Sequence, residues 1–123
     1  MIAKTILLSA AITGAALATF IVPASAAHLS GFAVVNSDGS LARGSNVTGA
    51  SHLSTGIYEV DFSTSVKSCA FTATTGLSGS SGTMPPSFVT VAGRNGNANG
   101  VYIRTFDSTG ADSDLGFHLN VRC

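Results

Sequence analysis

The stretch Gly56–Ala73 constrains the fold of this chain more than any other part of its sequence. At its start, Tyr58, Val60 and Phe62 alternate with two acidic residues. Alternation with a period of two is typical of a strand with one buried and one solvated face. A helix would scatter the same three side chains around its axis. We therefore predict a strand over this part, with its three apolar side chains in the core.

A second strand is predicted from Val66 to about Thr74, after a short polar link of serine and threonine. In this strand Cys69, Phe71 and Ala73 share one face. Two adjacent strands with a short link normally pair as an antiparallel hairpin. We therefore expect one hairpin, whose inner face joins these side chains to those of the first strand.

Residues 1–26 are a predicted signal peptide. Lys4 is their only charged residue, the run Ile6–Val22 is apolar and alanine-rich, and Ala24 and Ala26 give an A-x-A cleavage pattern. A transmembrane anchor is the alternative, but the run barely reaches the ~18 residues that span a bilayer. No basic cluster follows it, and no cysteine follows the cleavage site to accept a lipid. We expect export and cleavage.

The remaining residues, 27–123, have the length of one domain. Without Lys4, five basic and six acidic residues leave a net charge of −1. No basic stripe is present, so nucleic acid and anionic membranes are disfavoured as partners. No membrane span is expected once the signal peptide has been removed. The surface is instead rich in serine, threonine, asparagine and glycine, which suits a secreted β-protein.

Short apolar runs separated by turn signals continue along the chain, and no helix is predicted after residue 26. The further predicted strands are Gly31–Asn36, Leu41–Gly44, Phe88–Ala92, Val101–Phe106 and Leu115–Cys123, while Asn46–Ser54 is either a short strand or a loop. About seven short strands with turns every 8–12 residues predict an all-β fold, a single antiparallel β-sandwich of jelly-roll type.

The connections have clear turn chemistry. Asp38-Gly39 predicts a tight hairpin, and Gly76–Pro86 and Gly93–Gly100 are loops by composition. In the last strand, the residues predicted to face the core are Leu115, Phe117, Leu119, Val121 and Cys123. For Val101–Phe106 the inward face stays open, because apolar side chains occur on both faces.

Cys69 and Cys123 are the only cysteines of the chain. An even number in an exported protein predicts a disulfide, and both thiols lie on the predicted inner faces. Such a bridge would stabilise the fold by about 4 kcal/mol. A reactive catalytic thiol is the alternative, and it needs a nearby histidine or helix N-terminus to lower its pKa. Nothing near Cys69 in the sequence supplies one.

No metal or cofactor is predicted. The three histidines, His28, His52 and His118, show none of the spacings of zinc ligands. A weak calcium candidate is the trio of carboxylates Asp107, Asp112 and Asp114. Their spacing differs from a calcium-binding loop, and aspartate next to serine, threonine and glycine is also ordinary turn chemistry.

Catalytic motifs are absent from the sequence, so no catalytic residue is assigned. There is no G-x-S-x-G motif. Glu59 and Asp61 share one strand face and could act as a carboxylate pair in glycoside hydrolysis. They fit the solvated face of a strand equally well, and we expect no aromatic side chain near them. The chain also has no tryptophan, which disfavours a lectin.

Two surface features remain. Asn46-Val47-Thr48 matches the acceptor pattern for N-glycosylation, which matters only in a host that glycosylates. The loop Gly93–Gly100 offers hydrogen-bond donors for a ligand from Arg94, Asn95, Asn97 and Asn99. A long polar hairpin connection is the alternative interpretation of this loop.

The chain resembles small secreted bacterial β-domain proteins of unknown function. The segments that carry this resemblance are Ala33–Gly44, Gly56–Phe62, Cys69–Thr74 and Phe117–Cys123. In addition, the pattern G-x-Y-x-V-x-F is similar to a core strand of trimeric jelly-roll modules of the complement-head and phage-fibre kind. This second resemblance implies a homotrimer.

These patterns together favour a secreted, non-enzymatic binding or structural module at or beyond the cell envelope. Its partner would be an unknown protein or glycan ligand. A carbohydrate-binding module is the first alternative. A small secreted hydrolase that uses Glu59 and Asp61, or the histidines, is the second.

Overall fold

The structure, a computed structural model, describes residues 30–123; the predicted signal peptide and its cleavage site lie outside these residues. The described part contains eight strands and no helix. The strands are β1 (Ser30–Val35), β2 (Leu41–Ser45), β3 (Val47–Ser54), β4 (Ile57–Phe62), β5 (Ala70–Thr75), β6 (Phe88–Gly93), β7 (Gly100–Phe106) and β8 (Phe117–Arg122). Within residues 30–123, no helix is long and apolar enough to cross a membrane.

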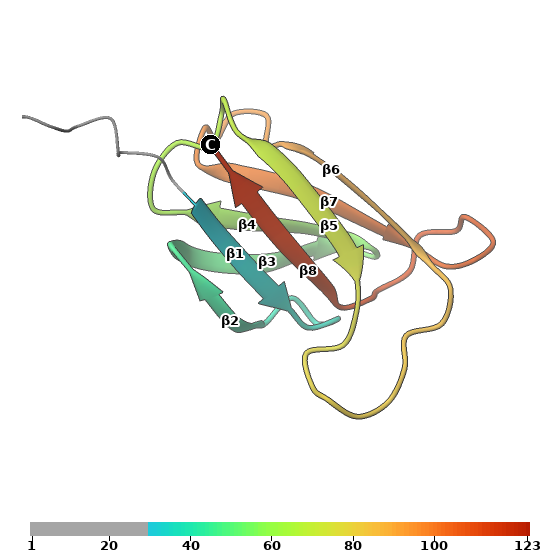
Figure 1. Ribbon diagram of the computed structural model, residues 1–123. Coiled ribbons are helices and arrows are strands. Elements are labelled where there is room, and N and C mark those ends of the chain that lie inside the picture. The colour runs from blue at the N-terminus through green and yellow to red at the C-terminus, as the bar shows by residue number, and fades with distance from the viewer. Residues whose placement is uncertain (1–29) are drawn as a thin grey trace, which may run out of the picture.

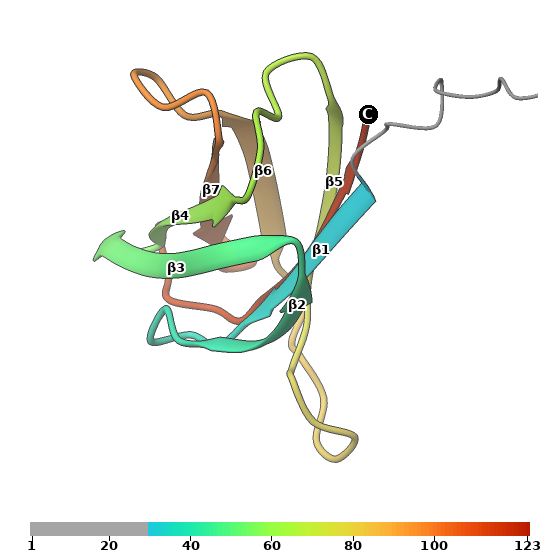
Figure 2. The ribbon, with the colours of Figure 1, turned by 90° about the vertical axis from the view of Figure 1, so that its left-hand side faces the viewer.

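The strands form two antiparallel sheets of four strands each. Sheet A has the order β2-β1-β8-β5, and sheet B has the order β3-β4-β7-β6. The two sheets pack face to face, as the side view in Figure 2 shows. The predicted all-β, sandwich-like architecture is therefore confirmed.

The core lies between the sheets and follows the period of two. Tyr58, Val60 and Phe62 of β4 are buried, as predicted, and they face Phe117 and neighbouring side chains of β8. The rings of Tyr58 and Phe117 meet edge to face, with centroids 5.1 Å apart. This contact ties the centre of one sheet to the centre of the other.

The predicted hairpin between β4 and β5 is wrong. β4 pairs with β3 and β7, whereas β5 pairs with β8 in the other sheet. The residues 63–69 carry the chain across the core, and Val66, which was assigned to the second strand, is buried there with its amide bonded to the carbonyl of Ala98 at 2.9 Å. The inward face of β5 is nevertheless as predicted, because Cys69 and Phe71 pack against the core.

The structure decides two points that the sequence left open, the state of Asn46–Ser54 and the inward face of β7. The segment Asn46–Ser54 is mostly strand β3, and Asn46, with φ of 62°, forms the bend that leads from sheet A to sheet B. Its Nδ2 donates to the carbonyl of Ser30 at 2.8 Å. In β7, Val101 and Ile103 face the core. Tyr102 on the same strand is only half-buried, so the outer face of sheet B carries this aromatic ring.

Both ends of the last predicted strand need correction. Leu115 precedes β8 and is half-buried, and Cys123 follows β8 and is exposed. The disulfide Cys69–Cys123 is confirmed. It joins the start of β5 to the end of β8, which are neighbours in sheet A.

Candidate functional site

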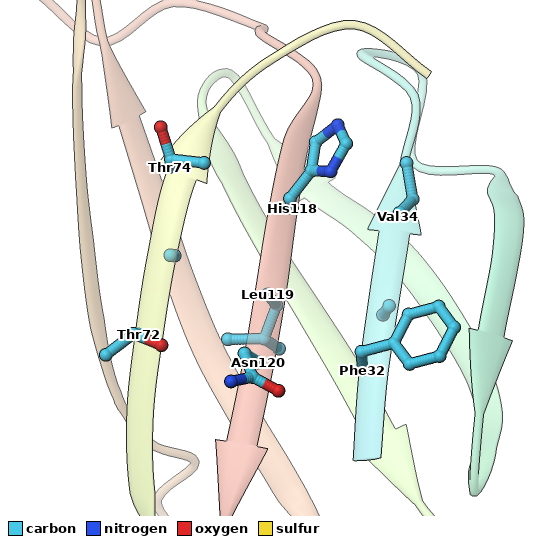
Figure 3. A pocket seen from close by; sticks show the side chains of 9 residues that line it. Phe32, Val34, Thr72, Thr74, His118, Leu119 and Asn120 are labelled. Carbon is cyan, nitrogen blue, oxygen red and sulfur yellow. The ribbon is translucent and has the colours of Figure 1, made fainter. Parts of the chain in front are cut away.

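The outer face of sheet A carries a groove of about 420 Å³, which we call the sheet A groove. It is lined by Phe32, Ala33, Val34, Thr72, Ala73, Thr74, His118, Leu119 and Asn120. Figure 3 shows Phe32 and Val34 along one side, Thr72 and Thr74 along the other, and the side chains of β8 between them. The groove thus spans β1, β8 and β5.

Strand register arranges the floor of the groove in two rows. Asn120 of β8 is the cross-strand partner of both Phe32 and Thr72. One row further along, His118 is the partner of both Val34 and Thr74. Strands lie ~4.8 Å apart and same-face residues on one strand ~6.7 Å apart, so the floor measures roughly 10 Å by 7 Å.

The loop formed by residues 76–87 closes one end of the sheet A groove. The ring of His118 forms a hydrogen bond through Nε2 with the carbonyl of Leu77 at 2.9 Å. Arg43 Nη1 donates to the carbonyl of Ser78 at 2.8 Å. Figure 1 shows this loop beyond the ends of the sheets, between β5 and β6. The opposite end of the groove, which we call its open end, lies one row beyond Asn120 on β8, at Arg122.

The groove combines an exposed aromatic ring with free polar groups. Phe32 is 42% exposed. Within the part of the chain that the structure describes, the side chains of Asn120 and Thr72 form no hydrogen bond with the protein. The lining contains no aspartate, glutamate, lysine or arginine. Such a surface can hold a ligand through stacking and hydrogen bonds together.

A second polar cluster lies on the outer face of sheet B, and it overturns the expectation that no aromatic side chain lies near Glu59 and Asp61. Arg94 Nε donates to Glu59 at 2.6 Å. Asn97 Nδ2 donates to Glu59 at 2.9 Å and to Asp61 at 2.8 Å. An aromatic ring is also present, because Tyr102 is the cross-strand partner of Glu59 and the Arg94 guanidinium lies 5.7 Å from its centroid.

These contacts change the interpretation of the loop Gly93–Gly100. Three of the four side chains predicted to meet a ligand turn back onto β4, since Arg94 and Asn97 bind the carboxylates and Asn99 Nδ2 donates to the carbonyl of Phe62 at 3.2 Å. Asn95 alone among the four is exposed. The loop therefore acts as a clamp on sheet B and has little free hydrogen-bonding capacity.

The pKa values of Glu59 and Asp61, the two carboxylates that the loop contacts, are shifted in opposite directions. The hydrogen bond with Asp61 lowers the pKa of Glu59 most, and the bonds from Asn97 and Arg94 lower it further. Burial raises the pKa of Asp61, and the neighbouring Glu59 raises it again. The pair can therefore share a proton, with Glu59 as the ionised member. The Glu59 side chain is only 13% exposed, so the pair has little room for a substrate.

The three carboxylates of the calcium candidate do not come together. Asp107 accepts from Thr109, Asp112 pairs with Arg104 at 2.8 Å, and Asp114 accepts from the amide of Gly56 at 2.6 Å. Among residues 30–123, no three side chains of histidine, cysteine, aspartate or glutamate are placed to hold a metal ion.

The described histidines lie apart, and His28 is outside the described residues. His118 lines the sheet A groove, whereas His52 on β3 bonds Asp114 at 2.8 Å. The backbone amide of Gly56 is the main cause of the lowered pKa of Asp114. Nearby, burial and then the charge of Asp114 raise the pKa of Tyr58 to about 12, and its hydroxyl donates to the carbonyl of Ser37 at 2.7 Å. This cluster ties the loops at one end of the fold.

Sequence reasoning missed the sheet A groove because its residues lie on three strands far apart in the chain. One signal was present: in G-F-A-V-V-N, apolar residues occupy both faces of the strand, so one apolar set, either Phe32 with Val34 or Ala33 with Val35, had to lie outside. Comparison of the chain with protein-family models, with curated proteins and with solved structures gives no match, so the geometry of the described residues is the basis for assigning a function.

Proposed function

We propose that this domain is a non-enzymatic binding module that acts at or beyond the cell envelope and holds its ligand in the sheet A groove. The observation that carries the proposal is the groove floor, where the exposed Phe32 and Thr72 flank Asn120 on opposite sides, and the side chains of Asn120 and Thr72 form no hydrogen bond with the described residues. Loops and faces held by a rigid sandwich are common places for binding.

The disulfide supports the proposed location at or beyond the cell envelope. Disulfides persist in oxidising environments and are rare in the cytosol. Cys69 and Cys123 are bonded to each other, which fits an extracytoplasmic protein. The predicted signal peptide over residues 1–26 points the same way.

The chemistry of the polar clusters supports a non-enzymatic role. Both thiols are consumed by the disulfide. Glu59 and Asp61 are engaged by Arg94 and Asn97, which leaves them little freedom to act on a substrate. Turnover of any sugar or peptide by the purified protein would contradict this part of the proposal.

A jelly-roll-like winding and a homotrimer belong to the same proposal. The first and last strands, β1 and β8, pair at the centre of sheet A, and β4 and β7 pair at the centre of sheet B. The pairing of the first strand with the last supports the jelly-roll-like winding, and the resemblance of Gly56–Phe62 to trimeric modules supports the trimer. Light scattering on the purified protein would contradict the trimer if it gave the mass of one chain.

The binding proposal is tested by ¹H–¹⁵N NMR on the exported protein with a panel of monosaccharides and capped dipeptides at millimolar concentration. We expect shifts at the amides of Phe32, Thr72 and Asn120, and their loss in Phe32→Ser. The control is Phe88→Ser, which removes a phenylalanine that is 57% exposed on sheet B and should leave the shifts unchanged. Shifts confined to Gly93–Gly100, or no shifts at all, would overturn the proposal.

A further inference from the structure

We propose that the ligand of the sheet A groove is a carboxylated sugar, such as a uronic acid unit of an acidic polysaccharide. This inference rests on the proposed binding function and gives its ligand a chemical class. Three features of the groove lead to it: the pairing of its strands, the kinds of group on its floor, and the charge at its open end.

Strand pairing excludes one common way of binding a peptide. An extended peptide is usually captured by adding a strand to a free sheet edge, through backbone hydrogen bonds. The centre of the groove instead lies over β1 and β8, each of which is paired on both sides, whereas β5 at its border is an edge strand. The backbone groups of β1 and β8 are therefore occupied, so a ligand on the floor between them must be recognised by side chains.

The side chains on the floor match the groups of a sugar. A pyranose has an apolar face of C–H bonds, which packs on an aromatic ring, and a rim of hydroxyls that both donate and accept. Phe32 offers such a ring. The amide of Asn120 and the hydroxyl of Thr72 can each donate and accept, and both are free of bonds to the described part of the protein. The floor, roughly 10 Å by 7 Å, has room for one or two sugar rings.

Charge at the open end selects an acidic sugar. The four strands of sheet A contain two charged residues, Arg43 and Arg122, and no carboxylate. Arg43 is tied to the carbonyl of Ser78. Arg122 is exposed, lies on the same face as Asn120 one row further along, and pairs in register with Ser30 and Ala70, which cannot neutralise it.

Among the described residues, Arg122 therefore has no side-chain partner, and its guanidinium lies next to a floor without lysine, arginine or carboxylate. Guanidinium groups bind carboxylates through two parallel hydrogen bonds, which gives both energy and orientation. A sugar that stacks on Phe32 and bonds Asn120 would direct a carboxylate toward Arg122. Sheet B offers no equivalent, since the arginines at its outer face are already paired, Arg94 with Glu59 and Arg104 with Asp112.

The test uses the full chain, exported so that its disulfide forms, and isothermal titration with oligomers of galacturonate, of alginate and of hyaluronan. Each oligomer is compared with its methyl ester, which keeps the sugar and removes the charge. We expect at least one free acid to bind roughly tenfold more tightly than its ester, at low salt. Arg122→Gln should remove this difference, Arg122→Lys should keep part of it, and Phe32→Ser should abolish binding of both forms.

The outcomes separate the two proposals. Equal binding of acid and ester, unchanged in Arg122→Gln but lost in Phe32→Ser, overturns the carboxylated sugar and leaves a groove for neutral glycans. Binding of a short polyglutamate as tightly as of the sugar acids overturns the sugar assignment. Two outcomes overturn the proposed binding function of the sheet A groove as well. The first is binding that survives in Phe32→Ser, and the second is no binding of any oligomer together with no NMR shifts in the groove.

Discussion

Glu59 and Asp61 stand two residues apart on β4, and their surroundings give them opposite effects on stability. The pKa of Glu59 is lowered in the folded chain, so its stabilisation is present above the unfolded pKa and is lost as pH falls through the folded pKa. The pKa of Asp61 is raised, so its stabilisation is full below the unfolded pKa and is lost as pH rises through the folded pKa.

Matched isosteric variants test this difference. At neutral pH, Glu59→Gln should lower the free energy of unfolding by about 1 kcal/mol, because it removes the charge on the Arg94 bond. Asp61→Asn should leave the free energy unchanged or raise it, because the amide oxygen can still accept from Asn97 and no longer repels Glu59. Urea denaturation from pH 3 to pH 7 measures both, and equal losses in the two variants would contradict the assigned acidities.

Gly39 occupies a position that no other residue fits. Its φ is 90°, and a Cβ placed on it would lie 2.7 Å from the backbone nitrogen of His52. Gly96 has a similar φ of 85° but no atom within 4 Å of that point, so it serves as the control. Gly96→Ala should cost about 1 kcal/mol from backbone strain. Gly39→Ala should cost at least about 1 kcal/mol more from the collision. Equal losses in urea denaturation would show that β3 moves aside freely.

At the residue scale, the sequence predicted features that depend on neighbouring residues, and it missed contacts between residues that are far apart in the chain. The buried face of β4 followed from alternation alone, because a strand sends successive side chains to opposite sides. The bond between Arg94 and Glu59 joins residues 35 positions apart, so no local pattern could reveal it. The free groups of Asn120 and Thr72 were hidden for the same reason, since their proximity depends on which strands pair.

At the scale of elements, the strands were easier to predict than their partners. The sequence predicts a link of only three residues after β4, and such a short link would force the two strands to pair as a hairpin. In the structure the link is residues 63–69, because Val66 fills the end of the core instead of starting β5. Both interpretations place the same side chains inward, so alternation could not decide between pairing within one sheet and crossing to the other.

The loop of residues 76–87 offers a test at this scale. Arg43→Gln removes the bond to the carbonyl of Ser78 and should increase amide hydrogen exchange in the loop roughly five- to tenfold. The melting temperature should stay nearly constant, because the bond lies on the surface. Arg122→Gln, on the same sheet but away from the loop, is the control. Unchanged exchange in Arg43→Gln would mean that the other contacts of the loop, such as the bonds of Leu77 to His118 and of Gly76 to Gly116, hold it without Arg43.

At the scale of the whole molecule, one covalent bond joins segments that are 54 residues apart. Removing it in the double variant Cys69→Ser, Cys123→Ser should lower the free energy of unfolding by about 4 kcal/mol, mainly by freeing the unfolded chain. Urea denaturation measures the loss, and wild-type protein in reductant should behave like the variant. A loss below about 1 kcal/mol would contradict this account.

The all-β class, the disulfide and the two-layer architecture could be predicted because they follow from alternation, cysteine count and turn spacing. The order of strands within each sheet could not, because several orders bury the same faces. The candidate site depends on that order: β8 must lie between β1 and β5 before Asn120 can meet both Phe32 and Thr72.

Because of the position of the disulfide, ligand binding in the groove should depend on whether the two cysteines have been oxidised. Arg122 directly precedes Cys123, and its partner Ala70 directly follows Cys69, so the bridge fixes the open end of the groove. A newly made chain in the reducing cytoplasm lacks this bridge, and the end of β8 would fray there. With the proposed export and the proposed sugar ligand, affinity for the sugar would develop only on oxidation outside the cytoplasm, so that the newly made protein would not be occupied by the cell's own sugars.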